Sequence, residues 1–285
     1  MENYLSQFFD YLLNVLLSTF NQLFLLLGPL LVFALILNLS AILTARMSVR
    51  FWGRNLFLYG FCWLGCSVHE LSHAFFAIIF GHKISHIELF KPSGNGESLG
   101  HVSHSYNKKS IYQKIGNFFI GISPLLSGGI VLFISVYFIF GYNVTKHYPF
   151  NISSGYLTDI NLFKQLTQNI WNSFLSFWAV ILANSGPYFW KPALLVYILY
   201  SIGSAMTLSK SDMVSALSGF LWVIVLFLVF NLVTRWMGNF AIGFLSRFIN
   251  NVSGFYFLLI LSALANLLFI VMLGILNLVK GLFVR

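Results

Sequence analysis

Charged residues are scarce in this chain. Its 285 residues include 16 lysines and arginines and only 7 aspartates and glutamates, so 8% of the chain is charged, whereas soluble globular proteins carry about 25%. Hydrophobic residues make up 58%, and the mean hydropathy is +0.83. This composition excludes a water-soluble enzyme, a disordered chain and a collagen-like protein. We therefore expect an integral membrane protein.

Cysteines and basic N-terminal residues are also few. The two cysteines, Cys62 and Cys66, both lie in an apolar run, which excludes a disulfide framework. Residues 1–21 contain no Lys or Arg, although a cleavable signal peptide needs a basic start, so we expect a mature N-terminus. The net charge of +9 fits Lys and Arg beside membrane spans, and we expect no nucleic-acid partner.

Apolar runs long enough to cross a bilayer dominate the chain, since a spanning helix needs about 20 such residues. They predict an all-α polytopic membrane protein with about six transmembrane helices, within one membrane domain over residues 1–285. The expected spans are 22–44, 56–80, 115–140, 193–208, 214–234 and 254–279.

The remaining segments have distinct expectations. Residues 1–21 mix apolar and polar positions, which predicts a helix at the membrane interface before Gly28-Pro29. The apolar run 171–184 is short and predicts a re-entrant or interfacial segment. Two β-compatible stretches, 84–90 and 99–106, flank a turn with Asn95-Gly96 and predict a small β-hairpin.

One motif in the second apolar run carries chemistry: His69-Glu70-Leu-Ser-His73. On a helix the two histidines lie about 40° apart and about 6 Å along the axis, so both can reach one zinc ion. Glu70 is displaced by about 100° from His69, where a base can take a proton from metal-bound water. The alternative is a polar cluster that packs helices together.

Other candidate ligands near the motif fit less well. Cys62 lies about 16 Å from His73 along a helix axis, too far for one shared ion, so the cysteines are expected to pack. His101 and His104 are three residues apart and would point to opposite sides of a strand, which argues against a metal shared by those two.

A catalytic zinc has three protein ligands, and Asp212 is the acid that lies between long apolar segments. An acid beside membrane spans is a functional candidate. Ser209 followed by Asp212 also resembles a capping box that opens a helix. The helix expected before it, 192–208, is only about 25 Å long, which would recess Asp212 to the depth of His73.

These features resemble the site-2 protease family of intramembrane zinc metalloproteases. The resemblance covers a core over residues 60–220, flanked by 1–55 and 221–285, and rests on the motif above, the Gly-rich hairpin and Asp212. The segments Leu99–His104 and Ile115–Pro124 resemble a bacterial branch. The family's usual prolines before the aspartate are absent, and Met213 stands where it has glycine.

The resemblance implies hydrolysis of peptide bonds in transmembrane substrates. Zinc would be held by His69, His73 and Asp212, with Glu70 as the base. The protein would be a multi-pass protein of the cell membrane, and we expect the bacterial inner membrane. A zinc-dependent membrane hydrolase with a non-peptide substrate, a transporter using the buried His, Glu and Asp side chains, and a non-catalytic scaffold are the alternatives. The sequence has no evident inverted repeat, which argues against the transporter.

Overall fold

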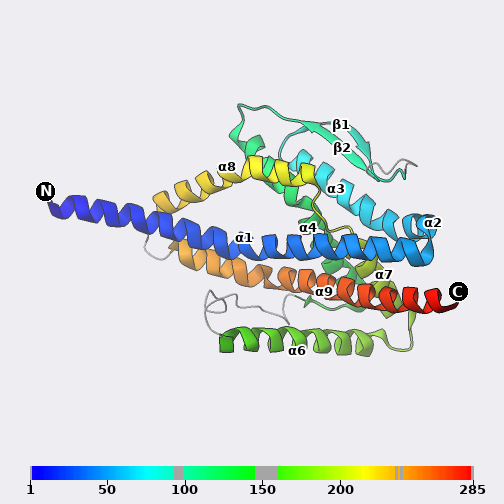
Figure 1. The fold of residues 1–285 in the computed structure, drawn as a ribbon. Coiled ribbons are helices and arrows are strands. Elements are labelled where there is room, and N and C mark those ends of the chain that lie inside the picture. The colour runs from blue at the N-terminus through cyan, green and yellow to red at the C-terminus, as the bar shows by residue number, and fades with distance from the viewer. Residues whose placement is uncertain (1, 93–98, 145–159, 235–236, 238–239, 284–285) are drawn as a thin grey trace.

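The computed structural model describes residues 2–92, 99–144, 160–234, 237 and 240–283 and is almost wholly helical (Figure 1). Its elements are α1 (Glu2–Trp52), α2 (Arg54–Leu56), the π-helical turn η1 (Phe57–Cys62), α3 (Trp63–Ile79), β1 (Lys83–Glu88), β2 (His101–Ser105), α4 (Ile111–Phe140), α6 (Ile160–Ser185), α7 (Trp190–Gly203), α8 (Lys210–Thr234) and α9 (Phe240–Phe283). The predicted all-α membrane fold with a small hairpin is confirmed.

Five helical segments of the described residues are long and apolar enough to cross a membrane: Tyr4–Trp52, Arg54–Ile79, Ile111–Phe140, Lys210–Thr234 and Gly254–Leu282. The sixth expected span, 193–208, corresponds to α7, whose 14 residues extend about 21 Å against a hydrocarbon core of about 30 Å. The apolar run 171–184 forms the second half of the 26-residue α6.

The helix predicted over residues 1–21 does not end before Gly28-Pro29. Helix α1 runs without a break for 51 residues, with Pro29 inside it. Two polar side chains of its first half are buried against α8: Gln22 donates to Asn231 Oδ1 at 3.0 Å, and Asn231 donates to Thr19 Oγ1 at 3.0 Å. These buried amide bonds keep the early part of α1 in line with the rest of the helix.

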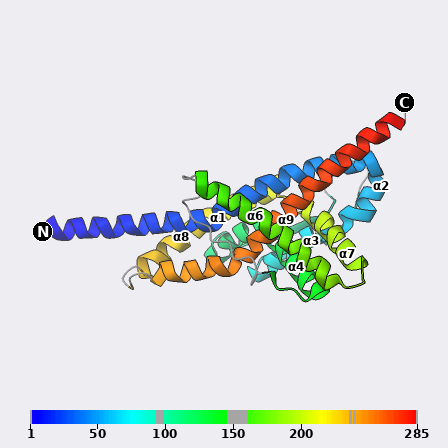
Figure 2. The same ribbon diagram turned by 90° about the horizontal axis from the view of Figure 1, so that it is seen from below.

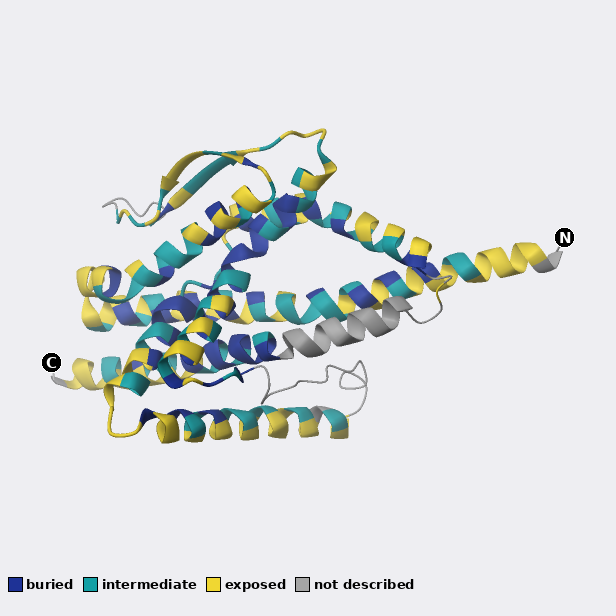
Figure 3. Ribbon diagram, turned by 180° about the vertical axis from the view of Figure 1, so that it is seen from behind, coloured by how far each residue is buried: buried dark blue, intermediate teal, exposed yellow. Residues whose placement is uncertain are grey.

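The helices pack around α4. Figure 3 shows the buried residues concentrated in the middle of the molecule, and fourteen of them lie on α4. The main apolar core joins α4, α7 and α9 through residues such as Leu125, Leu199 and Leu258. Helix α6 lies on the side of the bundle away from the hairpin (Figure 1), and the two chain ends extend beyond the bundle in opposite directions (Figure 2).

The hairpin follows directly from the end of α3. Gly81 has φ of 69°, a value that favours glycine, and the His82 amide donates back to Ala77 O at 2.8 Å, closing the helix. Strands β1 and β2 then pair antiparallel, with a register shift between Ile84 and His86. The predicted turn around Asn95-Gly96 lies outside the described residues.

Candidate metal site

The three predicted ligands lie together. His69 and His73 project from one side of α3 with their Nε2 atoms 3.2 Å apart. Asp212, in the first turn of α8, places Oδ1 at 3.3 Å from His73 Nε2 and Oδ2 at 3.7 Å from His69 Nε2. His73 and Asp212 are buried and His69 is half-buried. This cluster can hold a metal ion.

Main-chain carbonyls fix the opposite nitrogen of each ring. His69 Nδ1 lies 2.9 Å from Ala205 O, and His73 Nδ1 lies 2.9 Å from Ile120 O. A carbonyl oxygen only accepts, so each Nδ1 carries the proton and each neutral ring keeps a lone pair on Nε2. Two lone pairs and a carboxylate therefore converge, which calls for a cation between them. The donor set fits zinc, since imidazole and carboxylate are both common zinc ligands.

Pro124 explains why the Ile120 carbonyl is available to His73. In an α-helix, the amide of residue 124 would donate to the carbonyl of residue 120, but proline has no amide hydrogen. Pro124 lies inside α4. The freed carbonyl receives hydrogen bonds from the His73 ring and from Ser123 Oγ, the latter at 2.7 Å. The helix thus lacks one internal hydrogen bond, and the free carbonyl holds the ring of His73, a candidate metal ligand.

Asp212 caps α8 and also faces the two histidines, so its position is compatible with both roles that the sequence left open. The Ser209 amide donates to Asp212 Oδ2 at 2.7 Å, and the Asp212 amide donates to Ser209 Oγ at 3.2 Å, which completes a capping box. The same carboxylate faces the two histidines. The cap therefore orients the side chain toward the cluster, and the short α7 brings it to the predicted depth.

Glycines that the sequence analysis did not single out let the helices approach at this level. A Cβ on Gly65 of α3 would lie 2.1 Å from Ser201 O of α7. One on Gly121 of α4 would lie 2.5 Å from Asp212 O. A side chain at position 65 would push α3 away from α7, and one at position 121 would push α4 away from α8. Glycines in the middle of apolar runs were the available sequence signal.

Glu70 lies against the hairpin. Its side chain is half-buried, and an added Cβ on Gly100, the residue before β2, would lie 2.5 Å from Glu70 Cγ. Only a glycine at this position leaves room for the glutamate. Since Glu70 also follows His69 directly, one end of the hairpin is brought next to the metal cluster.

Other candidates lie outside the cluster. Glu88 accepts a hydrogen bond from Lys91 Nζ at 2.8 Å, and this contact lowers the pKa of the Glu88 carboxyl. The Cys62 and Cys66 sulfurs are 2.8 Å apart as free thiols and do not belong to the His–His–Asp group. His101 and His104 have different partners: His101 Nε2 contacts Ser103 Oγ at 2.7 Å, and His104 Nδ1 lies 3.0 Å from His82 Nδ1.

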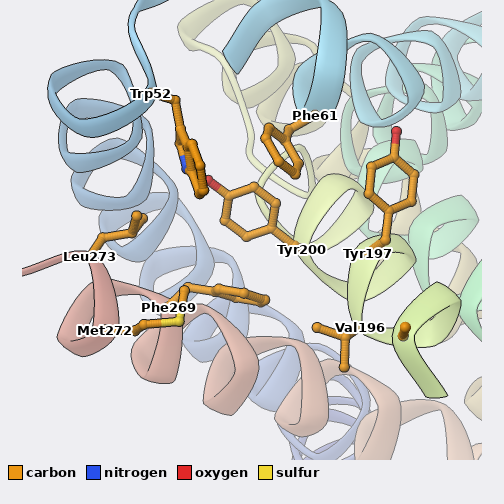
Figure 4. A pocket seen from close by; sticks show the side chains of 9 residues that line it. Trp52, Phe61, Val196, Tyr197, Tyr200, Phe269, Met272 and Leu273 are labelled. Carbon is orange, nitrogen blue, oxygen red and sulfur yellow. The ribbon is translucent and has the colours of Figure 1, made fainter. Parts of the chain in front are cut away.

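Two cavities flank the bundle. An aromatic pocket of about 190 Å³ lies between the end of α1, η1, α7 and α9, where Tyr200 projects between Trp52 and Phe61 (Figure 4). None of its lining residues belongs to the metal cluster. A second, wholly apolar cavity of about 230 Å³ lies between α1, α4 and α8 and is lined in part by Leu208 and Met213, on either side of Asp212.

Comparison of this chain with protein-family models, with curated proteins and with solved structures finds no match. The resemblance to the site-2 protease family therefore stays a prediction.

Proposed function

We propose that this protein is an intramembrane zinc metalloprotease of the cell membrane that hydrolyses peptide bonds in transmembrane protein substrates. The observation that carries the proposal is the convergence of the His69 and His73 lone pairs on the Asp212 carboxylate, with Glu70 next to them, inside an apolar helix. Burying these groups in a membrane is costly, so their presence indicates use.

His69, His73 and Asp212 would hold the ion. A zinc ion held there would supply Lewis acidity, which would polarise the scissile carbonyl and bring the pKa of a water molecule to about 7. Glu70 accepts the proton of the attacking water and passes it to the leaving amine. The carbonyls of Ala205 and Ile120 keep both rings in the tautomer that leaves Nε2 free.

A peptide bond has to leave its helix before it can be cut. The hairpin offers a partner for the unwound segment, since the sheet has two strands among the described residues and an extended peptide could add to an outer edge. Gly100 lies against Glu70 and directly precedes β2. A substrate strand paired at this end of the hairpin would lie close to the base.

The apolar cavity suits the approach of such a substrate. It is shared between α1 and α8 and continues along these helices into a further apolar groove, with Leu27, Leu31 and Phe220 lining both. At its other end the lining reaches Met213, next to Asp212. An apolar segment in the bilayer could thus approach the cluster without crossing water.

The test is Glu70→Gln in full-length protein reconstituted with a transmembrane substrate. The amide keeps the size of the side chain but has no basicity, so cleavage should fall by several orders of magnitude while zinc content stays at the wild-type value. Normal cleavage by the variant would refute the proposal. Cleavage of lipid esters alone would favour a non-peptide hydrolase, and metal-ion flux that Glu70→Gln reduces, without any hydrolysis, would favour a transporter.

A further inference from the structure

A second pair of histidines faces each other outside the membrane-spanning helices. His82 lies between the end of α3 and β1, and His104 lies on β2. Their Nδ1 atoms are 3.0 Å apart, close to the 3.2 Å between the Nε2 atoms of His69 and His73. A tetrahedral ion at about 2.0–2.1 Å from two nitrogens requires roughly 3.3 Å between them.

A main-chain carbonyl fixes one nitrogen of the His82 ring, as in His69 and His73. Its Nε2 lies 2.9 Å from Gln113 O, so Nε2 carries the proton and the Nδ1 lone pair points at His104. Tyr106 stacks on the ring with the centroids 5.2 Å apart. Gln113 is fixed in turn, because its side chain donates to Gly81 O at 2.7 Å and accepts from the Asn107 amide at 2.6 Å.

Both rings are suited to ligation at neutral pH. His82 is buried and His104 is partly buried. Burial lowers the pKa of each imidazole, and the proximity of His82 lowers the pKa of His104 further. Both are therefore neutral at pH 7 and have a lone pair to offer.

We infer that His82 and His104 form a second metal site, in which both Nδ1 atoms bind one divalent transition-metal ion and water completes the coordination. Imidazole nitrogens suit zinc, copper and nickel. The ion would join the segment before β1 to β2 and so fix the end of the hairpin at which β1 begins and β2 ends, opposite the end at Gly100. With two protein ligands, it binds more weakly than the three-ligand cluster.

The experiment counts zinc. Full-length protein in detergent is dialysed to equilibrium against buffered Zn²⁺, and bound metal is measured by elemental analysis. We expect two ions per chain in the wild type and one in His104→Gln. The affinity of His104→Gln for a second ion should be at least 10-fold lower than that of the wild type. His82→Gln, tested separately, should remove the same ion, because the site needs both rings.

The controls are His86→Gln and His101→Gln, which change exposed histidines of the same hairpin and should keep both ions. The ion that remains at His69, His73 and Asp212 shows that each variant is folded. A wild type with one ion, or His104→Gln with two, would show that the rings share only a hydrogen bond and would overturn the inference. This count uses no cleavage assay, so its failure is distinct from failure of the proposed protease activity.

Discussion

The two histidine pairs reach nearly the same spacing by different routes. His69 and His73 are four residues apart on one helix, so the helical repeat alone brings them together. His82 and His104 are 22 residues apart, and they meet only because Gly81 turns the chain and the two strands pair in one register. A pair set by local periodicity can be found in a sequence, whereas a pair set by strand register cannot.

The pairs also differ in what surrounds them. The helical pair faces a buried carboxylate, whereas the hairpin pair faces a tyrosine ring. A carboxylate supplies negative charge and a third ligand, so the helical cluster should bind a divalent ion far more tightly. Variants of the carboxylate test this contrast most directly.

Asp212→Ala should give the largest effect. It removes the third ligand and the helix cap together, so zinc at the cluster should fall by roughly 10-fold or more and cleavage with it, while stability falls by about 1 kcal/mol. Elemental analysis and thermal unfolding measure the two losses.

Asp212→Asn separates ligation from capping. Asparagine caps a helix as well as aspartate does, but it is a poorer zinc ligand. We expect near wild-type stability with zinc and activity still lost. Full zinc content in Asp212→Asn would mean that the carboxylate is only a cap, and the contrast between the two histidine pairs would disappear.

How much of the site the sequence predicts depends on how local each feature is. His69, Glu70 and His73 follow from helical spacing, and Asp212 follows from its position after a short helix. The hairpin strands follow from their β-compatible residues. By contrast, the contact of Gly100 with Glu70 depends on how the hairpin folds over α3. The continuity of α1 through Pro29 does not follow from its residues, and its contact with α8 joins Gln22 and Asn231, which are 209 residues apart.

Gly100→Ala should disturb the base without touching the ligands. The new methyl group would lie 2.5 Å from Glu70 Cγ and 2.8 Å from Leu89 O, so the glutamate or the hairpin has to shift. A displacement of about 1 Å at a catalytic group can cost about 100-fold in rate. We expect a loss of cleavage on that scale with full zinc content. Gly274→Ala, whose methyl group would contact nothing within 4 Å, serves as the control.

Pro124→Ala should act on the anchor of His73. The new amide hydrogen would bond to Ile120 O within α4 and compete with the His73 ring. Alanine is about 3 kcal/mol more favourable than proline inside a helix, so unfolding should become harder while zinc affinity falls by about 10-fold.

The matched control for this change is Pro29→Ala, at the proline inside α1. It should alter stability in the same direction and leave zinc binding as it was. Equal zinc affinity in Pro124→Ala and the wild type would show that zinc binding does not depend on the Ile120 carbonyl being free of a hydrogen bond within the helix.

Glu88→Gln should have the smallest effect, and it tests whether the hairpin pair has a carboxylate of its own. Lys91 donates to Glu88 on the exposed surface of the hairpin and lowers the pKa of the glutamate. A lowered pKa means that the charged pair stabilises the folded hairpin above about pH 4.3 and that this contribution is lost as the pH falls further. Because exposed ion pairs contribute little and are screened by salt, thermal unfolding at pH 7 should change only slightly, and not at all in high salt. Both zinc ions should remain. Loss of one ion in Glu88→Gln would make this carboxylate a ligand of the His82–His104 site, and the two histidine pairs would then differ in position but not in kind.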